Sequence, residues 1–122
     1  MALGRQSRNQ RRSPRVDVLL RVKGELVPLS CPITIFNLSE TGFAVLSEAR
    51  FRSGERLEFR LKGIRTPLVH VAAAAVHTQP LRDSPGLYMT GFAFRFGRSG
   101  DAAPEAAIRQ LIAAVAPAGF KV

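Results

Sequence analysis

Residues 56–62 read Arg-Leu-Glu-Phe-Arg-Leu-Lys, with charged and apolar residues in strict alternation. Successive side chains of a β-strand point to opposite faces, so a period of two predicts a strand with one face in the core and one in water. The turn pair Ser53-Gly54 stands just before this stretch. We therefore expect a half-buried strand here, and the other elements can be placed on both sides of it.

Other segments of apolar and β-branched residues, bounded by turn residues, also have the pattern of short strands. They cover residues 16–22, 33–37, 42–46, 69–78 and 87–96. Gly24-Glu25 is expected to begin a turn after the first of them. In the last of them Phe92, Phe94 and Phe96 share a face, which we expect to lie in the core.

Near the C-terminus the periodicity changes from two to that of a helix. Apolar residues recur at i, i+3, i+4 and i+7, and Pro104 suits a first helical turn. The stripe consists of Ile108, Leu111, Ile112 and Val115. We expect an amphipathic helix over about 103–116. Together the elements predict a mainly β fold, a small six-stranded antiparallel barrel with a C-terminal α-helix.

The chain has 122 residues, enough for one domain. Residues 1–15 are Arg-rich and lack apolar periodicity, so we expect a flexible basic arm, with the barrel domain over 16–122. The net charge is +9, and residues 1–23 contain seven Lys or Arg against one acidic residue, Asp17. Such an arm attracts phosphates, nucleic acid or an acidic membrane surface.

Cysteine usage and hydropathy favour a cytoplasmic protein without membrane insertion. Cys31 is the only cysteine, so an internal disulfide is excluded and a reducing compartment fits. The N-terminus lacks the apolar region of a signal peptide, and the longest apolar run, Val71–Val76, is far shorter than the roughly 20 residues of a membrane span.

Two short motifs carry the functional signal. Arg11-Arg12-Ser13-Pro14-Arg15 has the spacing RxxxR and ends directly at the first expected strand. Asn37-Leu38-Ser39-Glu40-Thr41-Gly42, at the end of the second, has the spacing NxSxxG. Arg8 to Arg12 also fits RxxxR, but the frame Arg11 to Arg15 is favoured because it stops at the strand.

The two motifs, in this order and ahead of this strand pattern, resemble the PilZ family, whose members bind the bacterial second messenger cyclic di-GMP. The resemblance covers nearly the whole chain and implies a six-stranded barrel with a C-terminal helix. It also implies a receptor that orders its arm over the barrel on binding the ligand and signals through a downstream protein partner.

The resemblance implies a role for each motif residue. Arg11 and Arg15 would bind guanine edges and phosphates, and Arg12 would stack or neutralise charge, which planar guanidinium groups can do. The roles implied for the second motif are a guanine contact from Asn37, a hydrogen bond to phosphate or guanine from Ser39, and a special backbone conformation with clearance at Gly42.

Two alternatives stay open: a small basic barrel that binds RNA or DNA, and a PilZ-like adaptor without a ligand. The absence of Trp and of an RNP-type aromatic motif counts against nucleic acid. Intact Arg11, Arg15, Ser39 and Gly42 count against the adaptor. We find no catalytic motif, and one Cys with His70 and His77 does not suggest a metal site, so we expect neither an enzyme nor a cofactor.

Overall fold

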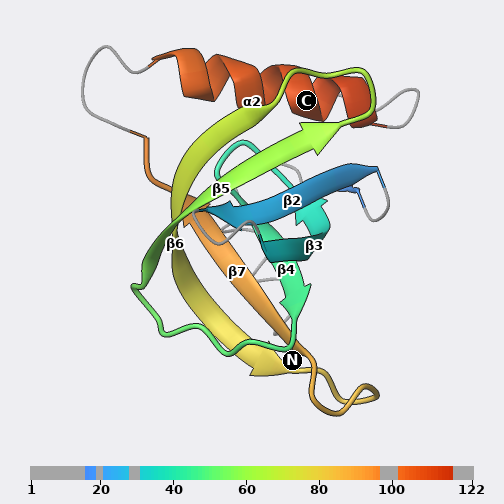
Figure 1. The fold of residues 1–122 in the computed structure, drawn as a ribbon, viewed down its shortest axis with the longest axis vertical. Helices are drawn as coiled ribbons and strands as arrows, with labels where there is room; N and C mark the ends of the chain where they lie inside the picture. The colour runs from blue at the N-terminus through green and yellow to red at the C-terminus, as the bar shows by residue number, and fades with distance from the viewer. Residues whose placement is uncertain (1–15, 19–20, 28–30, 97–101, 117–122) are drawn as a thin grey trace, which may run out of the picture.

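The computed structural model describes residues 16–18, 21–27, 31–96 and 102–116, and Figure 1 shows them as a strongly curved sheet with a helix across one end. The strands are β1 (Val16–Asp17), β2 (Val22–Val27), β3 (Cys31–Leu38), β4 (Gly42–Ser47), β5 (Arg56–Gly63), β6 (Val69–Pro80) and β7 (Tyr88–Phe94). The helix is α2 (Ala102–Val115).

Within the described part of the chain, six strands close into an antiparallel barrel. Going round it, β3 pairs with β2, β2 with β5, β5 with β6, β6 with β7, β7 with β4, and β4 again with β3. Closure leaves these strands without a free edge, which a small sheet otherwise has to protect. The predicted mainly β barrel with a C-terminal helix is confirmed.

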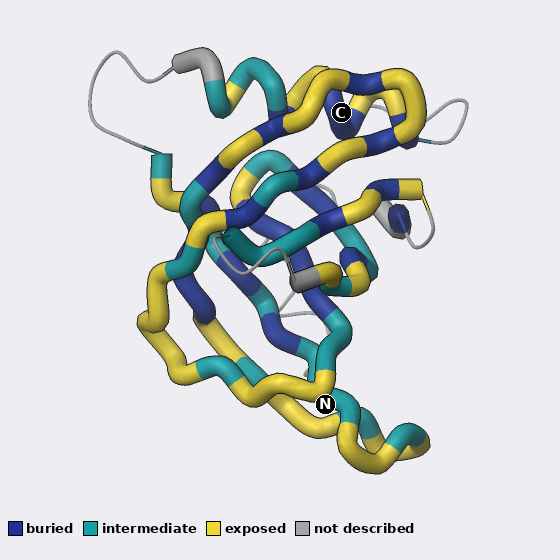
Figure 2. The backbone as a smooth tube through the Cα atoms, in the orientation of Figure 1, coloured by how far each residue is buried: buried dark blue, intermediate teal, exposed yellow. Residues whose placement is uncertain are grey.

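The six barrel strands and the helix share a single core, whose buried residues Figure 2 shows as dark stretches of the tube. Phe43, Phe59 and Phe92 are fully buried, and the ring of Phe43 lies 4.9 Å from that of Phe59 and 5.4 Å from that of Phe92. Phe94 is also buried and Phe96 is half-buried, so the predicted aromatic face is confirmed as core.

Helix α2 covers one end of the barrel. Its predicted apolar stripe is buried throughout, at 1–6% exposure. Arg21 donates from Nη1 to the carbonyl of Val115 at 2.7 Å, which satisfies one of the acceptors that every helix leaves open at its C-terminal end. No helix in the described residues is long and apolar enough to cross a membrane.

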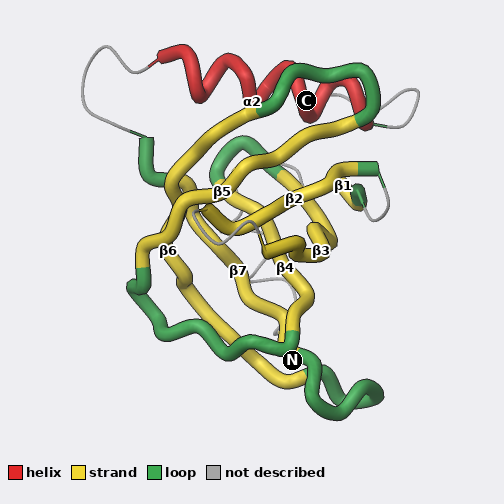
Figure 3. The backbone as a smooth tube through the Cα atoms, viewed as in Figure 1, coloured by secondary structure: helices red, strands yellow, loops and turns green. Residues whose placement is uncertain are grey.

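The segment 16–22 is not one strand, as expected, but two. The amides of Arg21 and Val22 both donate to the carbonyl of Val18, at 2.7 and 3.1 Å, and this local turn interrupts the ladder. The two-residue β1 and the longer β2 therefore pair with different parts of β3 (Figure 3). Most residues of this region that pair with β3 therefore lie in β2.

The expectation of a turn at Gly24-Glu25 is wrong, because both residues lie inside β2. Gly24 does not have the positive φ of a turn glycine. Its missing side chain has another reason: a Cβ there would lie 2.8 Å from Cδ1 of Ile35, a buried residue of the neighbouring strand. Gly24 is thus a packing glycine that makes room for Ile35.

Candidate functional site

Residues 37–42, which we call the corner, contain the turn that joins β3 to β4. Hydrogen bonds within the turn hold its shape. The amide of Ser39 donates to the carbonyl of Gly42 at 2.8 Å. The hydroxyl of Ser39 accepts from the amides of Thr41 and Gly42, both at 3.3 Å, and Ser39 is fully buried. Ser39 of the NxSxxG motif therefore fixes the shape of this turn.

Gly42 lies against the backbone of β7. A Cβ at Gly42 would collide with the carbonyl oxygen of Phe92 and lie 3.2 Å from the Cα of Ala93. The expected special backbone conformation of Gly42 is wrong, since its φ is not in the positive region. The expected clearance at Gly42 is needed, but for the backbone of β7. The amide of Phe94 donates to the carbonyl of Thr41 at 2.9 Å and holds the corner there.

Asn37 lies on the outside of the barrel. Leu38 and Phe43 pair across β3 and β4 and are fully buried, so the alternation of the strand turns Asn37 outward. Asn37 pairs with Ala44 of β4, whose neighbours along the strand also face the core. The side chain of Asn37 is half-buried in this position.

The register continues the outer row from Asn37 across three strands. Ala44 pairs with Gly91 of β7, and Gly91 pairs with His77 of β6. We call Asn37, Ala44, Gly91 and His77 the shelf. Three inter-strand spacings of about 4.8 Å make it roughly 14 Å wide. Between the polar side chains at its two ends it has nothing larger than a methyl group.

Two observations set the shelf apart from an ordinary outer face. The register shifts between Ile35 and Asn37 and again between Ala75 and His77, so each end of the shelf follows an irregularity that re-aims a side chain. A Cβ at Gly91 would meet nothing within 4 Å. Packing therefore does not require this glycine, and a strand glycine of this kind is typical of a place where a ligand comes close.

The arginines of the first motif, Arg11, Arg12 and Arg15, lie outside the described residues. The description begins at Val16, which pairs with Leu38, while Asp17 pairs with Asn37. The chain that follows Arg15 thus enters the barrel directly beside the corner.

The two histidines have ordinary polar neighbours. Nε2 of His70 lies 3.0 Å from Oε1 of Glu58, and Nε2 of His77 lies 3.2 Å from Oε1 of Gln79. Both histidines are exposed. Within the described residues no group of three or more His, Cys, Asp or Glu is placed to hold a metal ion. His77 belongs to the shelf only through strand register, which the sequence pattern does not reveal.

A closed six-stranded barrel, one capping helix and a polar corner beside the incoming N-terminal segment define a class of small β-barrel binding domains. The family model for the PilZ domain matches residues 9–114. The chain therefore belongs to the PilZ family. No curated protein matches it significantly.

Similar solved structures share the fold. MotI/DgrA, the inhibitor of motility from Bacillus subtilis, superposes with a TM-score of 0.66 at 17% identity over 86% of this chain and 50% of its own. YcgR from Escherichia coli, in complex with c-di-GMP, gives 0.64 at 17% over 87% and 44%. MrkH from K. pneumonia, also a c-di-GMP complex, gives 0.65 at 16% over 85% and 51%. The chain thus spans about half the length of these proteins.

Proposed function

We propose that this PilZ domain binds cyclic di-GMP between its arm and the outer surface formed by the corner and the shelf. The observation that carries the proposal is the pairing of Val16 with Leu38, because it brings the segment behind Arg15 into the barrel beside Asn37. Family membership and the c-di-GMP complexes of YcgR and MrkH support the same ligand.

Charge explains why both motifs are needed. Cyclic di-GMP is a dianion with two flat guanine bases, whereas the only ionisable residue in the corner is acidic, Glu40. The positive charge therefore comes from the arm, with Arg11 and Arg15 on phosphates and guanine edges and Arg12 stacking or neutralising charge. The flat bases need a surface without protruding side chains.

The shelf offers such a surface. Asn37 supplies an amide for a guanine edge, while Ala44, whose small side chain is buried, and Gly91 put no protruding side chain in the way of a flat ring. Ser39 acts by holding the turn, since its hydroxyl contacts the amides of Thr41 and Gly42. A direct bond from Ser39 to the ligand stays a prediction.

Ordering of the arm is the proposed output. Fixing the backbone of one residue costs about 1–2 kcal/mol of conformational free energy. A charge-assisted hydrogen bond stabilises by roughly 1.5–3 kcal/mol. The arm therefore orders only when several such bonds form together. The ordered arm gives the barrel a new surface for a downstream protein in the cytoplasm. In this proposal the domain is a receptor and not an enzyme.

Isothermal titration with cyclic di-GMP, GMP and a short RNA tests the function. We expect cyclic di-GMP to bind in the micromolar range or tighter, about −8 kcal/mol, and the other two far more weakly. Equal affinity for all three would indicate a basic barrel that binds nucleic acid. No binding of any of them would indicate an adaptor without a ligand.

A further inference from the structure

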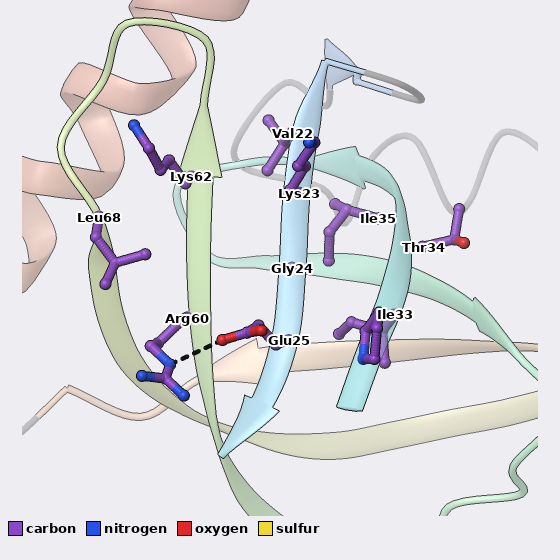
Figure 4. Close-up of a pocket in the computed structure, with 11 residues that line it drawn as sticks. Val22, Lys23, Gly24, Glu25, Ile33, Thr34, Ile35, Arg60, Lys62 and Leu68 are labelled. Carbon is purple, nitrogen blue, oxygen red and sulfur yellow. Dashed lines mark ion pairs between the residues drawn. The ribbon is translucent and has the colours of Figure 1, made fainter. Parts of the chain in front are cut away.

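A second surface lies on the other side of β3 from the shelf. It is a groove of about 450 Å³ on the outer face of β2, β3 and β5, with Leu68 at one margin (Figure 4). Its walls include Pro32 and Thr34 from β3, which pair with Glu25 and Lys23 of β2, and Leu68 from the segment that leads into β6. The shelf uses β3, β4, β7 and β6, so the two surfaces share only β3.

The charges along this groove are unevenly neutralised. Glu25 and Arg60 pair across β2 and β5 and form an ion pair, with Nε and Oε1 3.1 Å apart. One pair further along the same face, Lys23 stands directly opposite Lys62. Both lysines are exposed, and neither makes an ion pair with a described residue.

Two like charges directly opposite each other on neighbouring strands destabilise a sheet. The amine of Lys62 donates to the carbonyl of Thr66 at 2.7 Å, which places it but does not neutralise it. Lys23 has no such bond within the described residues. A cost to the fold that nothing in the described chain offsets is typical of a functional surface.

Exposed aliphatic side chains lie beside these lysines. Leu68 is 55% exposed and Ile64 is 70% exposed, both in the connection between β5 and β6. Arg65 in the same connection has a φ of +62°, unusual for a residue other than glycine. Of these three residues Leu68 lines the groove, so the connection adds an exposed apolar side chain to it.

We propose that the groove docks an acidic segment of a partner protein, with an aliphatic side chain against Leu68 and carboxylates at Lys23 and Lys62. The arm of this chain is excluded as the occupant because its charge has the same sign. A nucleic acid fits less well, since the groove is lined by aliphatic side chains and has no aromatic residue on which bases could stack.

The test uses a labelled probe peptide of about twelve residues, with two central leucines flanked by glutamates, and the full chain in ¹H–¹⁵N NMR and fluorescence anisotropy. We expect shift changes to cluster at Lys23, Lys62 and Leu68. Lys23→Glu and Leu68→Ser should each weaken binding about tenfold, or 1.4 kcal/mol. Arg109→Glu, an exposed charge reversal on α2, is the matched control and should change affinity less than about twofold.

A stability measurement separates docking from folding. Lys23→Glu replaces a like-charge pair with an opposite-charge pair, so its melting temperature should rise by about 1–5 °C while peptide binding falls. Unchanged peptide binding by Lys23→Glu, or shift changes confined to the arm, would overturn the proposal. So would a short RNA that displaces the peptide from the groove.

Different binding measurements test the docking proposal and the ligand proposal, so one can be contradicted without the other. Lys23→Glu should keep its affinity for cyclic di-GMP within about twofold, since the shelf lies on the other strands. Loss of cyclic di-GMP binding in this variant, with peptide binding intact, would contradict the separation of the two surfaces and with it the docking site.

Discussion

At the scale of single residues, two glycines on the neighbouring strands β4 and β7 have opposite reasons to be glycine. Gly42 is required by the fold, because its Cα faces the backbone carbonyl of Phe92. Gly91 is not, because a side chain there would enter open space. The NxSxxG motif is therefore partly a folding motif, and the residue that best reports on the ligand surface lies outside it.

We expect Gly42→Ala to destabilise the domain by on the order of 3 kcal/mol, since a backbone carbonyl cannot move aside as a side chain can. Gly91→Ala is the matched control and should be neutral or stabilise by about 0.5–1 kcal/mol, because glycine weakens a strand. Urea unfolding of both variants measures the difference. A Gly42→Ala protein as stable as the parent would refute the assigned packing.

Ser39→Ala should cost about 1–3 kcal/mol of unfolding free energy, because the amides of Thr41 and Gly42 lose their acceptor in a buried turn. Thr41→Ala changes an exposed neighbour and should cost less than about 0.5 kcal/mol. If Ser39→Ala unfolds at the same urea concentration as the parent, the turn does not depend on this hydroxyl.

Gly91→Leu tests the shelf. A Cβ at this position meets nothing within 4 Å, and the leucine would stand in the middle of the shelf. We therefore expect the variant to fold and to bind cyclic di-GMP at least about tenfold more weakly, a loss of about 1.4 kcal/mol. Calorimetric titration alongside thermal melting gives both quantities. Normal affinity with a normal melting temperature would place the ligand somewhere else.

At the scale of elements, helix α2 depends on a third glycine. A Cβ at Gly63, the last residue of β5, would lie 2.9 Å from Cδ1 of Leu111 and 3.0 Å from Cγ1 of Val115. The end of β5 therefore approaches the helix closely because no side chain separates them.

Gly63→Ala should push the helix outward and cost about 1–3 kcal/mol, since it adds a methyl group to a filled space. Hydrogen exchange of the α2 amides should rise more than that of β4, because the change loosens the helix and not the far wall. Uniform exchange in both elements would mean that helix and barrel open only together.

Periodicity alone predicted most of the elements. Alternation predicted β5, and the apolar stripe predicted α2, because both signals are local in sequence. The break at Val18 is a local turn, but residues 16–22 contain no Gly, Pro or Asn that would predict it. The packing role of Gly24 depends on Ile35 of β3, and no local pattern predicts that contact. The same holds for the shelf, because Gly91 meets Ala44 only through strand register. The turn residues of the corner predicted where it lies between two strands. They did not predict the hydrogen bonds within the turn.

At the scale of the whole molecule, the shaped surface and the positive charge come from different parts of the chain. The barrel has a shaped outer surface, and residues 1–15 contain five arginines and no acidic residue. In the proposed function, the ligand joins the two, and β3 lies between the ligand surface and the groove.

Amides of residues 1–15 should gain protection from hydrogen exchange when cyclic di-GMP is added, because the arm orders on binding. Affinity should also fall as salt rises, since the attraction is largely electrostatic. GMP at the same concentration is the control and should leave exchange unchanged. An arm with the same protection with and without cyclic di-GMP would contradict ordering on binding, even if the ligand binds.

The central claim is that the arm and the corner form one site, and a double-mutant cycle tests it most directly. Cyclic di-GMP affinity is measured by calorimetry for the parent, Arg15→Ala, Asn37→Ala and the double variant. We expect a coupling free energy of about 1 kcal/mol or more, because both residues hold the same ligand. Losses that add to within about 0.5 kcal/mol would show that the two motifs act independently and would contradict the account.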